Sequence, residues 1–178
     1  LVFASHTSFS QTNSQVNIKQ NSSCIVNIPD ANFKAALLAN LEINKNNDSE
    51  IQCTEADEFN GELNVAGKNI SNFAGIEAFT NITYLNCNSN SMTTLELTHN
   101  TALTEIHCSF NGSLTSLNIS GLTSVWNISC YNNSLTSLIV SGLTSLIQLE
   151  CYNNKLSTLD VSTETALNNL FCYDNLLT

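Results

Sequence analysis

The sequence predicts a solenoid, a stack of similar coils that share one continuous core. The first observation is a pattern, L-x-x-L-x-C-x-x-N, that recurs five times from residue 82 onward. The second is its spacing, since the cysteines of the pattern follow one another at intervals of 21 or 22 residues: Cys87, Cys108, Cys130, Cys151 and Cys172. A fixed period of this length is typical of repeat architectures.

The first half of each repeat predicts a short strand. In the fourth copy, Leu149 and Cys151 alternate with Gln148, Glu150 and Tyr152. Such alternation places the leucine and the cysteine on an inner face and the other three residues on an outer face. Because one coil cannot bury this inner face alone, we expect the copies to stack with their strands parallel.

The second half of each repeat predicts a polar turn and a return path. In the same copy Asn154 lies where the chain leaves its strand, and Leu156, Leu159 and Val161 follow it. The three apolar residues are expected to line the return path of the coil. The asparagine amide can bond backbone groups of neighbouring coils, so the five asparagines are expected to form a buried but satisfied row.

The repeats resemble those of the leucine-rich repeat family, in particular the short cysteine-bearing repeats of secreted bacterial surface proteins. The tails that begin at Leu135 and Leu156 carry the resemblance, as do the links 101–103 and 165–167, and a degenerate copy at 63–79 precedes the five clear ones. The resemblance implies the α/β horseshoe class, mostly β here, with parallel strands on a concave face and a small helical N-terminal cap. Members of this family mostly bind other molecules, and different ones.

The chain divides into three segments, a polar arm at 1–23, a helical cap at 24–60 and the repeats at 61–178. In the cap, Asp30 is a suitable N-cap for a helix over 32–41, in which Phe33, Leu37 and Leu41 share one face. A second short helix is predicted to begin at Thr54.

Between these two helices the sequence resembles a calcium-binding EF-hand loop. Oxygen-bearing side chains fall at the loop positions that the motif requires: Asn44, Asn46, Asp48, Glu50 and Glu55. Two departures weaken the match, since the loop starts with Asn instead of Asp and has Ser49 where the turn prefers Gly. The prediction is a weak calcium site, and the alternative is a polar turn that joins two helices.

The seven cysteines fall into two groups. The five in the repeats are interpreted as small buried side chains with inert thiols, because a row of thiols about 4.8 Å apart does not converge on a metal ion. Cys24 and Cys53 lie outside the repeats. They are predicted to form a disulfide, which places the protein in an oxidising compartment, outside the cell or at its surface.

Outward strand positions make the concave face and are the candidate ligand-binding residues. They include Tyr84, Glu105, His107, Tyr131, Glu150, Tyr152, Phe171 and Tyr173. Tyr131, Tyr152 and Tyr173 occupy the same position in successive coils, so their rings are expected to form a column. Such a column suits sugar rings or another protein surface. The alternative is that it stabilises only the sheet itself.

Several functional classes are disfavoured by composition and pattern. A net charge of −10 with five lysines and no arginine would repel phosphate backbones, so nucleic acid is not an expected partner. The longest apolar stretch, 35–39, is too short to span a bilayer. Enzymatic activity is not expected, because the neighbours His107 and Cys108 must point to opposite faces of a strand.

Three glycosylation motifs, at Asn118, Asn127 and Asn132, are expected to point outward and to be able to carry glycans. The sequence ends inside a repeat, which leaves Leu170 and Leu177 without a following coil. From this we predict a non-enzymatic extracellular module that self-assembles head to tail into a filament or a surface fibre. The alternative is an adhesion or recognition module that binds a separate protein or glycan through the concave face.

Overall fold

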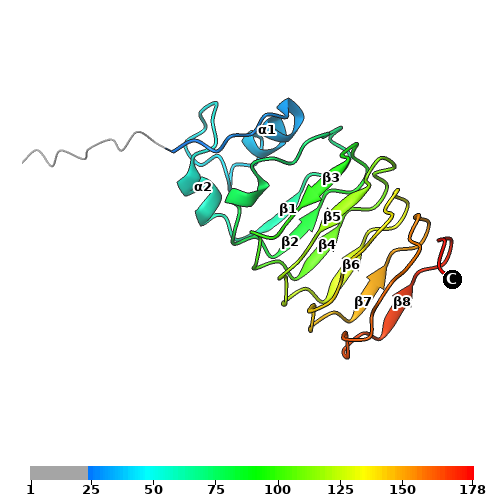
Figure 1. The fold of residues 1–178 in the computed structure, drawn as a ribbon. Helices are drawn as coiled ribbons and strands as arrows, with labels where there is room; N and C mark the ends of the chain where they lie inside the picture. Colours follow the sequence, from blue (N-terminus) through cyan, green and yellow to red (C-terminus); the bar gives the residue numbers. More distant parts are fainter. Residues whose placement is uncertain (1–23) are drawn as a thin grey trace, which may run out of the picture.

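The structure, a computed structural model, describes residues 24–178, and the arm at 1–23 lies outside the described residues. The chain begins with a cap that contains two short helices, α1 (Ala31–Leu38) and α2 (Cys53–Glu58). After the cap the chain winds into stacked coils that lead away from it (Figure 1). A 3-10 helix, η1 (Ile76–Ala78), lies in the first coil.

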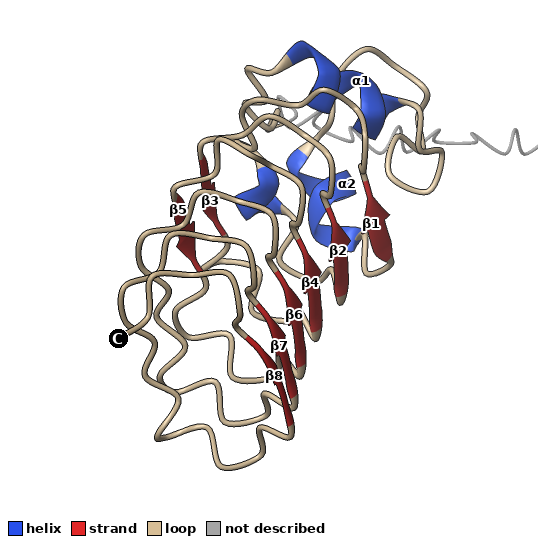
Figure 2. Ribbon diagram, turned by 90° about the vertical axis from the view of Figure 1, so that its right-hand side faces the viewer, coloured by secondary structure: helices blue, strands red, loops and turns tan. Residues whose placement is uncertain are grey.

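One parallel sheet runs the length of the stack (Figures 1 and 2). Its six strands are β1 (Glu62–Asn64), β2 (Tyr84–Asn86), β4 (Glu105–His107), β6 (Asn127–Ser129), β7 (Gln148–Glu150) and β8 (Asn169–Phe171). The strands pair in the register of the repeats, so that Leu63, Leu85 and Ile106 follow one another across the sheet. The predicted stack of parallel strands is therefore confirmed, and β1 shows that the degenerate copy is a true coil.

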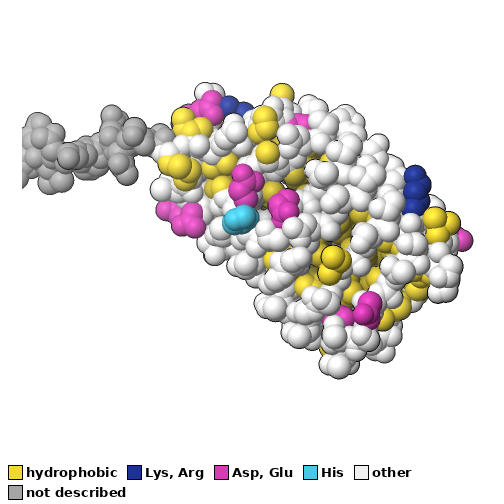
Figure 3. Space-filling model, in the orientation of Figure 1, with side chains coloured by type: hydrophobic (Ala, Val, Ile, Leu, Met, Phe, Trp, Pro, Cys, Tyr) yellow, Lys and Arg dark blue, Asp and Glu magenta, His cyan; other side chains and the backbone are white. Residues whose placement is uncertain are grey.

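A second, smaller sheet lies on the return path and was not predicted. It consists of β3 (Thr94–Glu96) and β5 (Ser116–Asn118), which pair in parallel on the opposite side of the coils from the large sheet (Figure 2). Figure 3 shows this side of the molecule, where charged side chains are few and scattered and hydrophobic side chains appear between them. The later coils return in the same place without regular strands.

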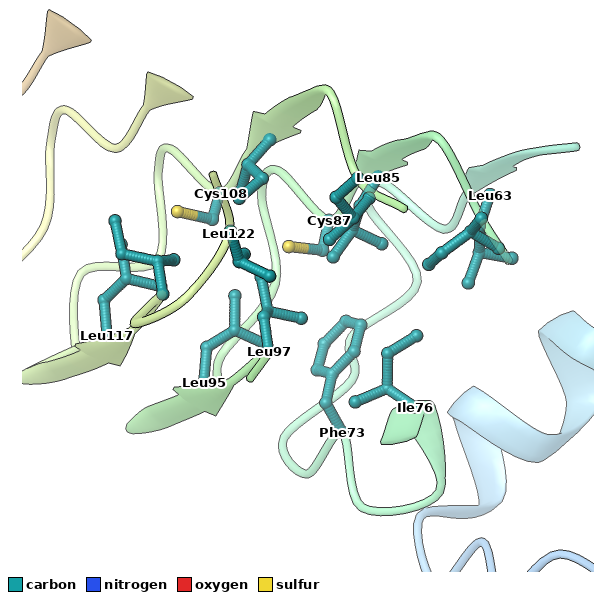
Figure 4. Close-up of a cluster of buried hydrophobic side chains, with 14 of the residues drawn as sticks. Leu63, Phe73, Ile76, Leu85, Cys87, Leu95, Leu97, Cys108, Leu117 and Leu122 are labelled. Atoms are coloured by element: carbon teal, nitrogen blue, oxygen red, sulfur yellow. The ribbon is translucent and has the colours of Figure 1, made fainter. Parts of the chain in front are cut away.

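The core fills the space between the two sides of the coils. Cys87 and Cys108 lie between the strands of the large sheet and the leucines of the return path, which include Leu95, Leu97 and Leu117 (Figure 4). The repeat cysteines are buried apart from Cys172, which is half-buried. Burial raises the pKa of the Cys87 and Cys130 thiols well above the ordinary value, so they stay protonated and weakly reactive.

The repeat asparagines form the expected row, buried in the first four repeats and half-buried at Asn175 in the last. Asn111 donates hydrogen bonds from its amide nitrogen to the carbonyl of Cys108 at 3.0 Å and to that of Cys87, one coil earlier, at 3.3 Å. Its Oδ1 accepts from the backbone N–H of Asn90, and the Oδ1 of Asn133 accepts in turn from the N–H of Asn111. Each asparagine side chain therefore bonds the backbone groups at the end of its own strand and backbone groups of a neighbouring coil.

The cap is fixed to the first coil through Asp30. Its Oδ1 accepts from the backbone N–H groups of Asn32 and Phe33 at the start of α1, as predicted for an N-cap. Its Oδ2 accepts from the N–H and the hydroxyl of Ser71 and from the N–H of Asn72. One carboxylate thus joins the helix to the repeats.

Two predictions about the cap have different outcomes. The disulfide between Cys24 and Cys53 is present, and the backbone of the same two residues is also hydrogen-bonded. The predicted helix over 32–41 is too long, because α1 ends at Leu38. Leu41 therefore leaves the apolar face and is exposed, while Phe33 and Leu37 are fully buried.

We predict that Asn111→Ala lowers the free energy of unfolding by about 3 kcal/mol, because it leaves buried backbone groups in two coils without partners. Urea denaturation measured by circular dichroism would give this value. Asn168→Ala is the matched control, since Asn168 is exposed and the change should cost less than about 0.5 kcal/mol. Equal effects of the two substitutions would contradict a structural role for the asparagine row.

A second prediction concerns pH. Partial burial alone raises the pKa of Asp30, but the hydrogen bonds from Phe33, Ser71 and Asn72 outweigh it and lower the pKa to about 2. Because this lies below the unfolded value of about 3.9, the stabilisation is complete above pH 4 and is lost as pH falls toward 2. Asp30→Asn should therefore be less stable than the wild type at pH 6, and this difference in stability should become smaller toward pH 2. If thermal unfolding shows a difference in melting temperature that does not depend on pH, this account is refuted.

Candidate functional site

The outer side of the large sheet presents its side chains in three columns that run along the stack. The first column contains Glu62, Tyr84, Glu105, Asn127, Gln148 and Asn169. The second contains Asn64, Asn86, His107, Ser129, Glu150 and Phe171. The third, just beyond the strands, contains Asn88, Ser109, Tyr131, Tyr152 and Tyr173. We call these three columns the strand face; they include all eight predicted ligand-binding residues.

The centre of the strand face is a network of polar side chains. Asn127 donates to Oε2 of Glu105 at 3.3 Å, and the same carboxylate oxygen lies 3.6 Å from Nε2 of His107. On the next strands the hydroxyl of Ser129 donates to Oε2 of Glu150 at 2.7 Å. The short side chains of β6 are consequently buried under their longer neighbours.

Two acceptors in this centre stand out. The Oδ1 of Asn127 and the hydroxyl of Ser109 are buried and have no hydrogen-bond partner among the described residues. Buried polar atoms are normally satisfied, so atoms of this kind indicate water or a bound molecule. The sequence pattern did not single out Ser109, because serine at that position looks like an ordinary solvated residue.

The three tyrosines of the third column stack on one another, as predicted. Ring centroids lie 4.4 Å apart between Tyr131 and Tyr152 and 4.6 Å apart between Tyr152 and Tyr173, with nearly parallel planes. Burial, the neighbouring tyrosines and the charge of Glu150 raise the pKa of Tyr152 to about 12, so this side chain stays neutral. Tyr84 does not join it and packs against His107 at 5.2 Å.

This stacking decides what the column can bind. Sugars pack against aromatic rings through the ring faces, and here the rings cover each other's faces except at the last ring, Tyr173, which stacks only on Tyr152. The column therefore offers ring edges and hydroxyl groups to the outside. Edges and hydroxyls suit the aromatic, apolar and polar side chains of another protein better than the flat side of a sugar.

A fourth aromatic residue extends the column and was missed by the sequence analysis. Phe110 contacts Tyr131 edge to face, with ring centroids 5.2 Å apart and an interplanar angle of 79°. We call Phe110, Tyr131, Tyr152 and Tyr173 the aromatic row. The signal was present in the sequence, since Phe110 occupies the position that holds Ser89, Asn132, Asn153 and Asp174 in the other repeats.

The charge of the strand face is negative. Glu62, Glu105 and Glu150 belong to it, and among the described residues its three columns contain no lysine or arginine. His107 is paired with a carboxylate, and Cys108, its neighbour in sequence, is buried in the core. The two side chains therefore lie on opposite sides of the sheet, so they do not form a nucleophile and base.

The three predicted glycosylation residues are all engaged in the fold. Asn118 donates to Oε2 of Glu96 at 2.7 Å, and Asn132 accepts a hydrogen bond from the amide of Asn153. Asn127 is a correction: it points to the outer side, as predicted, but is only 8% exposed because it packs beside Glu105. Its amide is therefore not free to carry a glycan in the folded protein.

The predicted calcium residues are brought together, but their oxygens accept hydrogen bonds from the loop itself. Glu55 accepts from the N–H of Lys45 and Gln52 at 3.0 Å each. Asp48 accepts from the N–H of Glu50 at 2.8 Å and from the side chains of Asn46 and Gln52.

The oxygens of the remaining three predicted ligands are occupied as well. The Oδ1 atoms of Asn44 and Asn46 both accept from the N–H of Asp48, and Glu50 forms an ion pair with Lys34 at 2.7 Å. Among the described residues no group of three or more His, Cys, Asp or Glu side chains could hold a metal ion. This geometry favours the polar turn that the sequence left open.

We therefore expect millimolar calcium and a chelator to give the same melting curve, because binding would have to break these hydrogen bonds. Glu55→Gln should lower the free energy of unfolding by about 1–2 kcal/mol in either condition, since the amide cannot accept as strongly from the two N–H groups. A rise in melting temperature with calcium that Glu55→Gln abolishes would restore the calcium site.

No helix in the part of the chain that the structure describes is long and apolar enough to cross a membrane. No protein-family model matches the sequence, and no curated protein matches it.

Solved structures do resemble this one. An internalin of Listeria monocytogenes, InlF, is 26% identical with a TM-score of 0.73, over 87% of this chain and 47% of InlF. A functional domain of InlJ from the same species, described as including a cysteine ladder, is 21% identical with a TM-score of 0.49, over 86% of this chain and 48% of InlJ. This chain thus spans about half the length of either protein. The in-register parallel coils and the likeness to InlF show that this chain has the leucine-rich repeat fold.

Proposed function

We propose that this chain is an extracellular recognition module that binds another protein through the strand face, without catalysis. The observation that carries the proposal is the arrangement of that face, where carboxylates, amides and the aromatic row lie in register along the stack. No described segment crosses the outer side of the large sheet in Figure 2, so a partner can approach it directly.

A protein partner fits this surface better than a glycan. The tyrosine rings cover one another's faces, which removes the flat surface that sugar rings use. Aromatic edges, amides and carboxylates together make the mixed surface that protein interfaces present. A repeat protein also offers an extended array suited to a large partner.

Two observations support an extracellular location. The disulfide between Cys24 and Cys53 is of the kind that persists in oxidising compartments. The short cysteine-bearing repeats also resemble those of secreted bacterial surface proteins. The likeness to InlF favours recognition over the head-to-tail filament, which stays a prediction without support from the described contacts.

We predict that charge reversal on the strand face abolishes recognition. The probe is a displayed library of random 12-residue peptides, selected on the wild-type protein. Glu105→Lys should weaken the selected peptides by about tenfold or more, because it reverses a charge at the centre of the face. The matched control is Glu96→Lys, the same charge change on the exposed side of β3. Affinity can be measured by fluorescence polarisation, and thermal melting shows whether each variant is folded.

The opposite pattern would reject the proposal. Peptides that are insensitive to Glu105→Lys but are lost on Glu96→Lys would assign recognition to the side of β3 and β5 instead.

A further inference from the structure

Phe110 stands in a backbone conformation that its side chain disfavours. The residue two positions after each repeat cysteine has a positive φ, between 53° and 58° in the five repeats. Asn132, Asn153 and Asp174 are suited to this left-handed region because their short polar side chains hydrogen-bond locally. Phe110, with a φ of 58°, has no such compensation and is strained.

The same residue is exposed although it is aromatic. About half of the Phe110 surface, 51%, is open to solvent. It meets Tyr131 nearly at a right angle, whereas the tyrosines stack in parallel. Phe110 therefore keeps an open ring face next to a column whose rings cover one another. Strained residues that the fold does not need are typical of functional sites.

The charge beside the aromatic row is negative. Glu150 accepts the hydrogen bond from Ser129, two residues before Tyr131, and precedes Tyr152 by two residues on its own strand. Both carboxylate oxygens are engaged, since Gln148 donates to Oε1 at 2.9 Å, so the carboxylate is held in place beside the rings. A fixed carboxylate on the same face as an exposed aromatic ring suits a cationic partner whose guanidinium group stacks on the ring.

We propose that Phe110 determines the specificity of the strand face by stacking against an arginine side chain of the protein partner, which the carboxylates of the face attract. This inference rests on the proposed function and names the partner as a cationic protein segment. The net charge of −10 adds long-range attraction for such a segment.

The experiment uses the peptides selected on the full-length wild-type protein. In each peptide every arginine is replaced by citrulline, which keeps the shape of the side chain and removes its charge. Affinities are measured for wild type, Phe110→Asn, Phe110→Trp and the control Ser89→Asn, which occupies the same position one coil earlier. The selected peptides should contain arginine, and one citrulline exchange and Phe110→Asn should each weaken binding by about tenfold or more.

The two changes should also be coupled. Citrulline should weaken binding to Phe110→Asn by less than about threefold, because the stacking partner is already gone. Phe110→Trp should retain binding, and Ser89→Asn should not change it. Phe110→Asn should raise the melting temperature by about 2–4 °C, since asparagine relieves the backbone strain. Stability and binding then move in opposite directions, so lost binding cannot be attributed to unfolding.

The outcomes separate this inference from the proposed function. Peptides without arginine, or unchanged affinity for Phe110→Asn alongside loss with Glu105→Lys, would overturn the role of Phe110 and leave the strand face as the recognition surface. Failure of the library to enrich any peptide, or binding that no strand-face substitution affects, would overturn both.

Discussion

The register between neighbouring coils is the constraint on which the rest of the structure depends. Each strand bonds only to the strand one repeat away, and the buried asparagine at its end bonds to two successive coils. A strand of three residues would not hold its place by backbone bonds alone. The asparagine adds satisfied polar contacts in the core, where a shifted register would leave backbone groups without partners.

The fixed register also controls the chemistry of the surface. Because equivalent residues are stacked at the spacing of paired strands, about 4.8 Å, three tyrosines at one repeat position must lie ring against ring. This arrangement stabilises the sheet and at the same time removes the ring faces from use by a ligand. Phe110 lies one repeat position after the tyrosines and meets Tyr131 edge to face, so its ring does not join the parallel stack.

At the cap, the carboxylates hold the fold together by accepting hydrogen bonds. Asp30 joins α1 to the first coil, and Glu55 closes the loop before α2 by accepting from two backbone N–H groups. These carboxylates already accept hydrogen bonds from the cap and the first coil, so the loop is held together by its own groups. The spacing of the loop residues resembled a calcium site because both arrangements need oxygen atoms that converge on one point.

The sequence by itself determined the repeating architecture. The period, the inward Leu and Cys, the asparagine row, the tyrosine column and the link between Cys24 and Cys53 all follow from residue spacing and type, because a repeat imposes the same local environment on every copy. The end of α1 was harder to predict from sequence, since it depends on where the chain must turn toward the first coil.

Only the tertiary structure decided the features that arise between coils. The pairing of β3 with β5, the burial of Asn127 under Glu105 and the isolation of the acceptors on Asn127 and Ser109 result from contacts between residues about one repeat apart. Phe110 illustrates what the sequence shows and what only the structure shows. Its position among asparagine and serine residues was visible in the sequence, but its strain and its open ring face depend on a backbone angle that no sequence pattern measures.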